Sequence, residues 1–271
     1  MRRKKLVAAV CLAIAVLLIC CPFILRQHSD KARSEVMYVQ VESVSSTDHL
    51  AVVKELEAAD RYNASLANGL ASITNDERAA AKTDYLTLLN LAGDGIMGTV
   101  EIPILGTTLP MAHGTETETL EHYVGHVVGS SLPVGGPNTH AVLSGHSGMA
   151  TSKMFSDLEQ LQIGDYFVIH VLGLDLYYLI DQINVVLPDD TSKLGIERGK
   201  DYVTLVTCTP YGVNTHRLLV RGTRISEEDV PPLPTTQRSA WTTKSWQGVL
   251  VVVGTTAIGL AVFLYARRSR K

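Results

Sequence analysis

Two long uncharged segments, one near each end of the chain, most constrain how this sequence can fold. Residues 6–25 contain no charged side chain, follow the basic run RRKK and precede Arg26. Residues 245–266 are also uncharged and are followed by the basic tail RRSRK. Each segment is long enough to cross a bilayer as a helix. We therefore expect an N-terminal membrane anchor over residues 1–26, a second span over residues 245–266 and a polar domain between them.

The flanking residues predict the orientation of this arrangement. Lysine and arginine beside membrane spans prefer the cytoplasmic side, and here they flank the outer end of both segments. Both termini, including the tail 267–271, should therefore lie in the cytoplasm and the middle of the chain outside. The exit CCPFILR of the first segment offers no small-residue cleavage site, which favours an uncleaved anchor over a signal peptide.

The formal net charge of −3 combines 24 basic and 27 acidic residues. Because many of the basic residues lie at the termini, the region between the spans is acidic. A nucleic-acid partner is not expected, since it calls for a basic patch on the folded part. The polar region is long enough for one hydrophobic core.

The polar region divides into a helical part and a β-rich part. Over residues 27–92 we expect helices, one beginning near His49 with apolar side chains recurring as far as Leu70, and another over residues 75–91. Short β-like runs follow, with helical interruptions at residues 116–123 and 153–161, and a proline-rich linker at 227–244. The runs are residues 99–103, 141–143, 166–171, 176–180, 183–186, 202–207 and 217–223. Their spacing predicts an all-β sandwich or barrel.

Cys208 is the only cysteine outside the first uncharged segment, so the polar region offers it no disulfide partner. It ends the apolar run TLVTC at residues 204–208. Three interpretations stay open on composition: a buried structural thiol, an intermolecular bridge or a catalytic thiolate. A thiol redox role is disfavoured because no CxxC partner is present.

Two basic residues are candidate partners for a nucleophilic thiol, which needs a nearby imidazole or arginine and donors for an oxyanion. His146 lies in LSGHSG, where an apolar run ends between glycines. Arg217 follows Cys208 across YGVN, which predicts a hairpin turn that returns Arg217 beside Cys208. Taken singly, each has a structural alternative, a satisfied histidine or a solvent-facing arginine.

No metal or cofactor is expected. His122 and His126 are spaced for one helical face, but Gly125 interrupts that helix and no third ligand lies nearby. No acidic loop has convincing calcium-ligand spacing.

These residues resemble the sortase family. TLVTC matches the TLxTC signature of the family, and TCTPYGVNTHRLLVRG at residues 207–222 resembles the class C, pilus-building branch. Further matches are GIMG at 95–98, EIP at 101–103, HGT at 113–115, SLPVGG at 131–136 and LSGH at 143–146. The resemblance covers about residues 90–225.

The resemblance implies a mainly β fold: a closed barrel of about eight strands over residues 93–226, with N-terminal helices and a transmembrane helix at each end. It assigns His146 as general acid and base, Cys208 as nucleophile and Arg217 to substrate and oxyanion stabilisation. The side chains implied as substrate-binding are Thr207, Leu205 and His126.

The activity implied is that of a cysteine transpeptidase. It would cleave LPxTG-type sorting signals through a thioester and join pilins to a lysine amine on a Gram-positive cell surface. The partners would then be pilins with such signals. Two alternatives remain: attachment of surface proteins to cell-wall precursor, or a membrane-tethered binding module with an inert thiol.

One departure from the class C pattern concerns an N-terminal lid. Class C enzymes commonly carry an Asp followed by an aromatic residue that covers the cysteine. Between Tyr62 and Tyr85 this chain has no proline and no aromatic residue, and Asp76 is at most a remnant. We therefore expect a missing or weak lid and an accessible Cys208.

Overall fold

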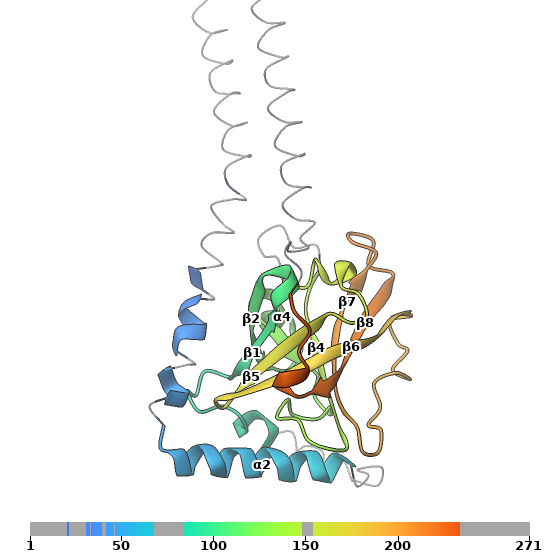
Figure 1. The fold of residues 1–271 in the computed structure, drawn as a ribbon. Helices are drawn as coiled ribbons and strands as arrows, with labels where there is room; N and C mark the ends of the chain where they lie inside the picture. The colour runs from blue at the N-terminus through green and yellow to red at the C-terminus, as the bar shows by residue number, and fades with distance from the viewer. Residues whose placement is uncertain are drawn as a thin grey trace, which may run out of the picture.

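Eight strands close into a single barrel (Figure 1). The computed structural model describes residues 21, 31–32, 34–39, 42–45, 47–67, 84–147 and 154–233. Within these ranges the strands follow one another around the barrel in the order β1-β2-β3-β4-β7-β8-β6-β5. The expected mainly β fold and the closed eight-stranded barrel are therefore confirmed.

The strands are β1 Ile96–Ile102, β2 Thr107–His113, β3 Val124–His126, β4 Thr139–Ser144, β5 Tyr166–Val171, β6 Leu174–Val186, β7 Asp201–Thr209 and β8 His216–Ile225. The α-helices are α2 His49–Ala67 and α4 Thr117–His122, and the 3-10 helices are η2 Pro103–Leu105, η3 Leu158–Gln160 and η4 Glu227–Asp229. The pairs β2–β3 and β4–β7 are parallel, and the other neighbours are antiparallel.

Alternation along the strands builds the core. In β5, Phe167, Ile169 and Val171 are buried inside the barrel, whereas His170 between them is only half-buried. Successive side chains of a strand point to opposite faces, so every second residue lines the interior. The other strands contribute to the same interior cluster in the same way.

The runs 176–180 and 183–186, expected as two strands, form one continuous strand, β6. The register with β8 shifts between Ile180 and Gln182, which marks a β-bulge at Asp181. A bulge adds one residue and re-aims the side chains after it, so Ile180 and Ile183 both pack against the core despite their odd spacing. In the sequence, the polar pair Asp181-Gln182 between these two isoleucines indicated an interruption between two strands.

Two strands of the barrel were not predicted from the sequence. β2 contains Pro110, which lacks an N–H group and normally argues against a strand. Here it is tolerated because the β3 pairing begins only at Met111, so Pro110 has a strand neighbour on one side alone. β3 has three residues, too few to show alternation.

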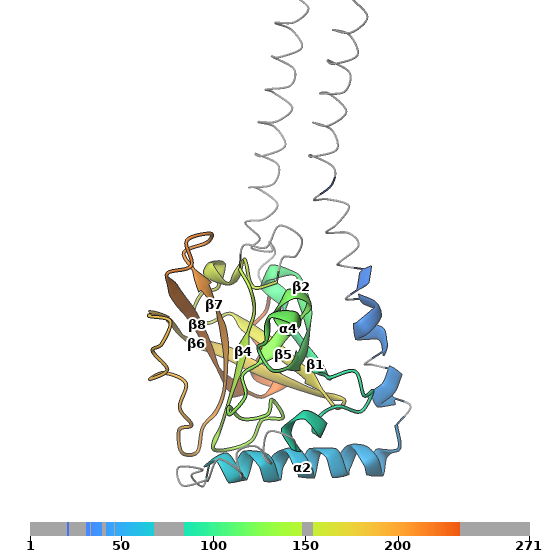
Figure 2. The ribbon, with the colours of Figure 1, turned by 180° about the vertical axis from the view of Figure 1, so that it is seen from behind.

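Helix α2 packs across one end of the barrel, opposite the β7–β8 turn (Figures 1 and 2). Ala59 is fully buried there, and the Asn63 side chain exchanges two hydrogen bonds with the backbone of Leu132, at 3.0 and 2.7 Å. The helix expected to start near His49 is confirmed. Its extension to Leu70 falls outside the described residues.

Other expectations are met in part or lie outside the described ranges. Helix α4 lies within the interruption predicted at 116–123, but the one at 153–161 is only the short η3 after a series of turns. Of the helix expected over 75–91, residues 84–91 are described: residues 84–87 are helical, whereas residues 88–91 are not, so the helix ends earlier than predicted. Both predicted spans, apart from Cys21, and most of the linker lie outside the description. In the part that is described, no helix is long and apolar enough to cross a bilayer.

Candidate active site

Cys208 lies on the outer face of the barrel near the end of β7. Val203 and Leu205 point into the core, so the alternation of the strand places Thr204, Val206 and Cys208 on the outside. The thiol is unpaired and half-buried. This position gives the sulfur solvent access together with support from the strands on either side.

The β7–β8 hairpin places Arg217 directly opposite Cys208. The two residues are register partners in the antiparallel pair. The turn between them is closed by the amides of Val213 and Asn214, which donate to the carbonyl of Pro210 at 2.9 and 3.0 Å. The predicted hairpin and the return of Arg217 beside Cys208 are therefore confirmed.

The guanidinium group of Arg217 is held over this hairpin. Its Nη1 donates to the carbonyl oxygens of His216 and Asn214, at 3.1 and 3.4 Å. These contacts keep a permanently charged donor group at the end of β8 that pairs with the Cys208 end of β7.

The loop that carries His146 follows β7 on its other side. Strand β4 runs parallel to β7 as far as the pair Ser144–Val206. The amide of Gly145 then donates to the carbonyl of Val206 at 3.0 Å, and the hydroxyl of Ser147 donates to the carbonyl of Cys208 at 2.7 Å. His146 is thus fixed between two residues that are both bonded to β7.

Gly145 is required by the close packing of this loop. A Cβ atom at position 145 would lie 2.7 Å from Cδ2 of Phe155, well inside normal contact. The carbonyl of Gly145 accepts a hydrogen bond from the Thr207 hydroxyl at 2.7 Å, and the amide of Phe155 donates to the carbonyl of His146 at 3.0 Å. The glycine therefore lets this loop pack closely against β7 and Phe155.

The structure therefore brings the three predicted catalytic residues to neighbouring positions on β7, on β8 and in the loop after β4. A cysteine whose strand is flanked on one side by a histidine-bearing loop and on the other by an arginine-bearing strand has the components for nucleophilic catalysis: an attacking sulfur, a proton carrier and a cationic donor.

The three residues expected to bind substrate lie in the interior. Leu205 and His126 are fully buried, and Thr207 is 2% exposed. His126 Nε2 lies 2.8 Å from the carbonyl of Ser131, and its Nδ1 lies 2.9 Å from the Tyr85 hydroxyl. Burial lowers the pKa of His126 to about 4. These placements give the three residues structural contacts, and their contact with a substrate stays a prediction.

Two supporting contacts were not anticipated from the sequence. One is the Ser147 bond to Cys208. The other is a 2.6 Å hydrogen bond from the Thr209 hydroxyl to Glu159, which ties η3 to the end of β7. Glu159 is far from Thr209 along the chain, so no local pattern signals the pair.

The histidine pair considered as metal ligands is separated by the fold. His122 is exposed at the end of α4, whereas His126 is buried in β3. Among the residues that the structure describes, no group of three or more histidine, cysteine, aspartate or glutamate side chains is arranged to hold a metal ion.

Comparison with known proteins agrees with this fold and site. The Sortase domain family matches residues 100–225. Sortase D of Bacillus subtilis (strain 168) is 31% identical over 132 residues, which cover 48% of this chain and 64% of that protein.

Two solved structures are also similar. Sortase C1 from Streptococcus agalactiae has a TM-score of 0.66 and 42% identity, over 73% of this chain and 99% of that one. Clostridium perfringens sortase C, solved with the C-terminal cell wall sorting motif, has a TM-score of 0.62 and 39% identity, over 71% of this chain and 99% of that one.

A closed barrel with a thiol, an imidazole and a guanidinium group on adjoining elements defines a cysteine transpeptidase architecture, and the chain belongs to the sortase family. The two solved structures described above are class C sortases, in agreement with the resemblance of residues 207–222.

Proposed function

We propose that this protein is a pilin-polymerising transpeptidase that cleaves LPxTG-type sorting signals and transfers the product to a lysine amine. The observation that carries the proposal is the pairing of Cys208 with Arg217 across the β7–β8 hairpin, with the His146 loop bonded to the other side of β7. Similarity to class C sortases, one of them solved with a sorting motif, supports the choice of substrate.

The first half of the reaction forms a thioester. The Cys208 thiolate attacks the carbonyl carbon of the threonine in the Thr-Gly bond, and the electron pair of the carbonyl moves to its oxygen. Arg217 stabilises this oxyanion with its charge and N–H groups. When the intermediate collapses, the carbon–nitrogen bond breaks and His146 protonates the departing glycine amine.

The second half transfers the acyl group to an amine. The lysine amine of the next pilin attacks the thioester carbonyl and passes a proton to His146. The carbon–sulfur bond then breaks, which regenerates the Cys208 thiolate and leaves an isopeptide bond. Water at the same carbonyl would give hydrolysis, so the site must favour the amine.

A covalent trapping experiment tests the chemistry. The full-length protein, incubated with an LPxTG-type peptide, should gain the mass of the acyl fragment, and hydroxylamine should release it. Cys208→Ala should form no adduct. Cys21→Ala makes the same substitution outside the barrel, and this variant should still form the adduct. An adduct that persists in Cys208→Ala would overturn the proposal.

Pilus polymerisation is tested in cells. Cys208→Ala should abolish the high-molecular-weight pilin ladder, and Cys21→Ala should leave it intact. A ladder that persists, combined with loss of monomeric surface proteins from the wall, would assign the protein to cell-wall attachment. A ladder and wall proteins that are both unchanged would leave the inert binding module.

The membrane topology is part of the same proposal. The uncharged segments and their basic flanks support two spans with cytoplasmic termini and an extracellular barrel. Protease added to intact protoplasts should digest the barrel and spare epitope tags fused to either terminus. Digestion of either tag would contradict this orientation.

A further inference from the structure

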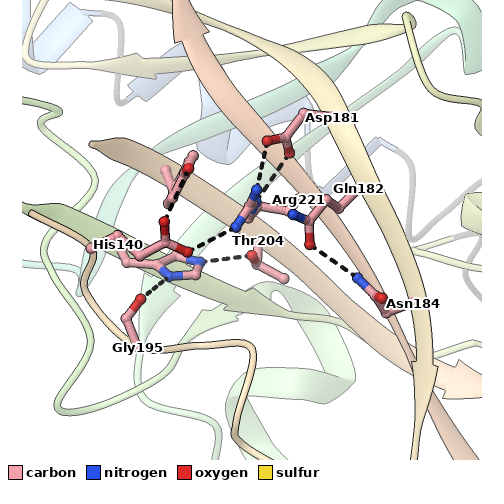
Figure 3. Close-up of polar contacts among 9 residues, drawn as sticks. His140, Asp181, Gln182, Asn184, Gly195, Thr204 and Arg221 are labelled. Carbon is pink, nitrogen blue, oxygen red and sulfur yellow. Dashed lines mark hydrogen bonds and ion pairs between the residues drawn. The ribbon is translucent and has the colours of Figure 1, made fainter. Parts of the chain in front are cut away.

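A polar network lies on the outer face of the sheet, and Thr204, its residue on β7, is four positions before Cys208. Figure 3 shows the network. Arg221 donates from Nε and Nη2 to the two carboxylate oxygens of Asp181, at 3.0 and 2.7 Å. Its Nη1 donates to Glu197 at 3.2 Å. His140 lies 2.8 Å from the carbonyl of Gly195 through Nδ1 and 2.7 Å from the Thr204 hydroxyl through Nε2.

This network joins the sheet to the long loop of residues 187–200 between β6 and β7. Arg221 belongs to β8, His140 to β4 and Thr204 to β7, whereas Gly195 and Glu197 belong to the loop. The loop runs outside the barrel in both views of the fold (Figures 1 and 2). Loops of this length without secondary structure are commonly functional.

The strand residues at the centre of the network are buried although they face outward. His140 and Thr204 are each 1% exposed and Arg221 is 9% exposed. The Arg221 guanidinium also lies 3.9 Å from the centre of the Tyr202 ring. Because Gly195 and Glu197 bond directly to these side chains, the loop is the element that covers them, and it is held at two points.

The hydrogen bonds define the state of His140. A carbonyl oxygen only accepts, so Nδ1 carries the hydrogen that is donated to Gly195, and Nε2 accepts from the Thr204 hydroxyl. Burial lowers the pKa of His140, which favours the neutral ring. The carboxylate of Asp181, aimed by the bulge in β6, holds Arg221 from the opposite side.

The 187–200 loop lies beside the outward-facing residues of β7 and β8 that lead along the sheet to Cys208. It leaves β6 at Val186, the register partner of Arg217. Along β8, Arg217 is followed two residues later by Leu219, which pairs with Val206 of β7. Arg221 comes two residues after that and pairs with Thr204. From Thr204 to Cys208 the strand rises about 13 Å. An extended four-residue segment before the scissile bond spans a similar length, about 13 Å, and so reaches from the thiol to the loop.

We propose that Arg221 and His140 are positioning residues that hold the 187–200 loop as one wall of the groove in which the sorting signal binds. The inference rests on the proposed function, because it concerns how the substrate of that reaction is held. The network does not contact the reacting atoms. Its loss should therefore weaken peptide binding and leave the chemistry of a bound peptide unchanged.

Glu197→Gln tests the loop side of the network without removing a buried group, since the Glu197 side chain is 56% exposed. In the full-length protein we expect KM for an LPxTG-type peptide to rise about two- to fivefold, with kcat unchanged, as for loss of one partly exposed ion pair. Glu228→Gln, on η4, makes the same change at an exposed glutamate and should leave both constants unchanged.

Thr204→Val tests the His140 side. The substitution keeps the shape of the side chain and removes the hydroxyl that donates to His140, and KM should rise about three- to tenfold. Thr204→Ser retains the hydroxyl and should restore KM. A purely structural role would lower the amount of folded enzyme, and hence apparent kcat, without this change in KM.

Loop position has a readout that is independent of activity. Limited trypsin digestion at Lys193 and Arg198 should be faster in Glu197→Gln and Thr204→Val than in the wild-type protein. An unchanged KM and cleavage rate in both variants would overturn the inference, as would a fall in kcat at constant KM. A wild-type protein that cleaves no sorting-signal peptide would instead overturn the proposed function, and the groove with it.

Discussion

The hydroxyl of Ser147 donates a hydrogen bond to the backbone carbonyl of Cys208, with 2.7 Å between the two oxygens. Ser147 directly follows His146, so this one bond joins the backbone of the proposed proton carrier to that of the proposed nucleophile. Small displacements between reacting groups are costly in catalysis. The bond therefore offers a direct test of how the site is held together.

Ser147→Ala should lower kcat/KM for an LPxTG-type peptide about three- to tenfold, in line with the loss of one neutral hydrogen bond. The cause is a less constrained loop around His146. The rate of thioester formation, followed by intact mass, measures the effect. Ser147→Thr retains the hydroxyl and serves as the matched control. Equal rates in the alanine and threonine variants would contradict this role.

Gly145→Ala should destabilise the fold and reduce activity. The new Cβ atom would meet Phe155 at 2.7 Å, and overpacking of this kind costs about 1–3 kcal/mol. Urea unfolding of the full-length protein measures the change. Gly195→Ala is the control, because a Cβ atom there has nothing within 4 Å. Equal losses of stability in the two variants would show that the contact with Phe155 is readily relieved.

Local sequence patterns predicted the parts of the site that are close along the chain. The YGVN turn has positive φ angles at Gly212 and Asn214, residue types that accept this conformation. A tight hairpin fixes the register of its strands, so the pairing of Cys208 with Arg217 followed from the spacing.

The remainder of the site depends on pairings between distant segments. The parallel pairing of β4 with β7 aligns Ser144 with Val206, and no local periodicity encodes which strands will be neighbours. The placement of His146 was therefore expected from family resemblance together with its glycine loop. The network of His140 and Arg221 was not expected, because its residues lie on five segments of the chain, β4, β6, the 187–200 loop, β7 and β8, and each residue alone has an ordinary structural interpretation.

Stability should fall in acid because of His126. This fully buried ring has a pKa of about 4 in the folded protein, compared with an ordinary value of 6.5, chiefly because burial disfavours the charged form. Between these values the unfolded chain binds a proton that the folded protein does not. The stabilisation that comes from the neutral His126 ring is therefore complete above pH 6.5. It is lost as the pH falls toward 4, and the free energy of unfolding decreases by on the order of 3 kcal/mol.

A histidine variant isolates this effect from other titrating groups, including His113 and Tyr85 near the ring. His126→Gln should be less stable than the wild-type protein at pH 7.5, and the difference in unfolding free energy should shrink toward pH 4.5. His122→Gln, at an exposed histidine, should leave the wild-type pH dependence intact. Parallel curves for wild-type and His126→Gln proteins would rule out His126 as the titrating group.

Cys208 should react rapidly with a thiol reagent in the resting protein. The side chain is half-buried and unpaired. Residues 63–83 contain no aromatic residue, and in the Asp84-Tyr85 pair that follows, the Tyr85 ring is fully buried and hydrogen-bonded to His126. Iodoacetamide labelling of the full-length protein, with Cys208→Ala as the blank for the other cysteines, measures access to the sulfur.

Replacing residues 68–83 by a Gly-Ser linker of equal length preserves the span of the chain. It should change the labelling rate by no more than about twofold if that segment does not cover the thiol. An increase of about tenfold or more would show that these residues act as a lid without the usual sequence pair.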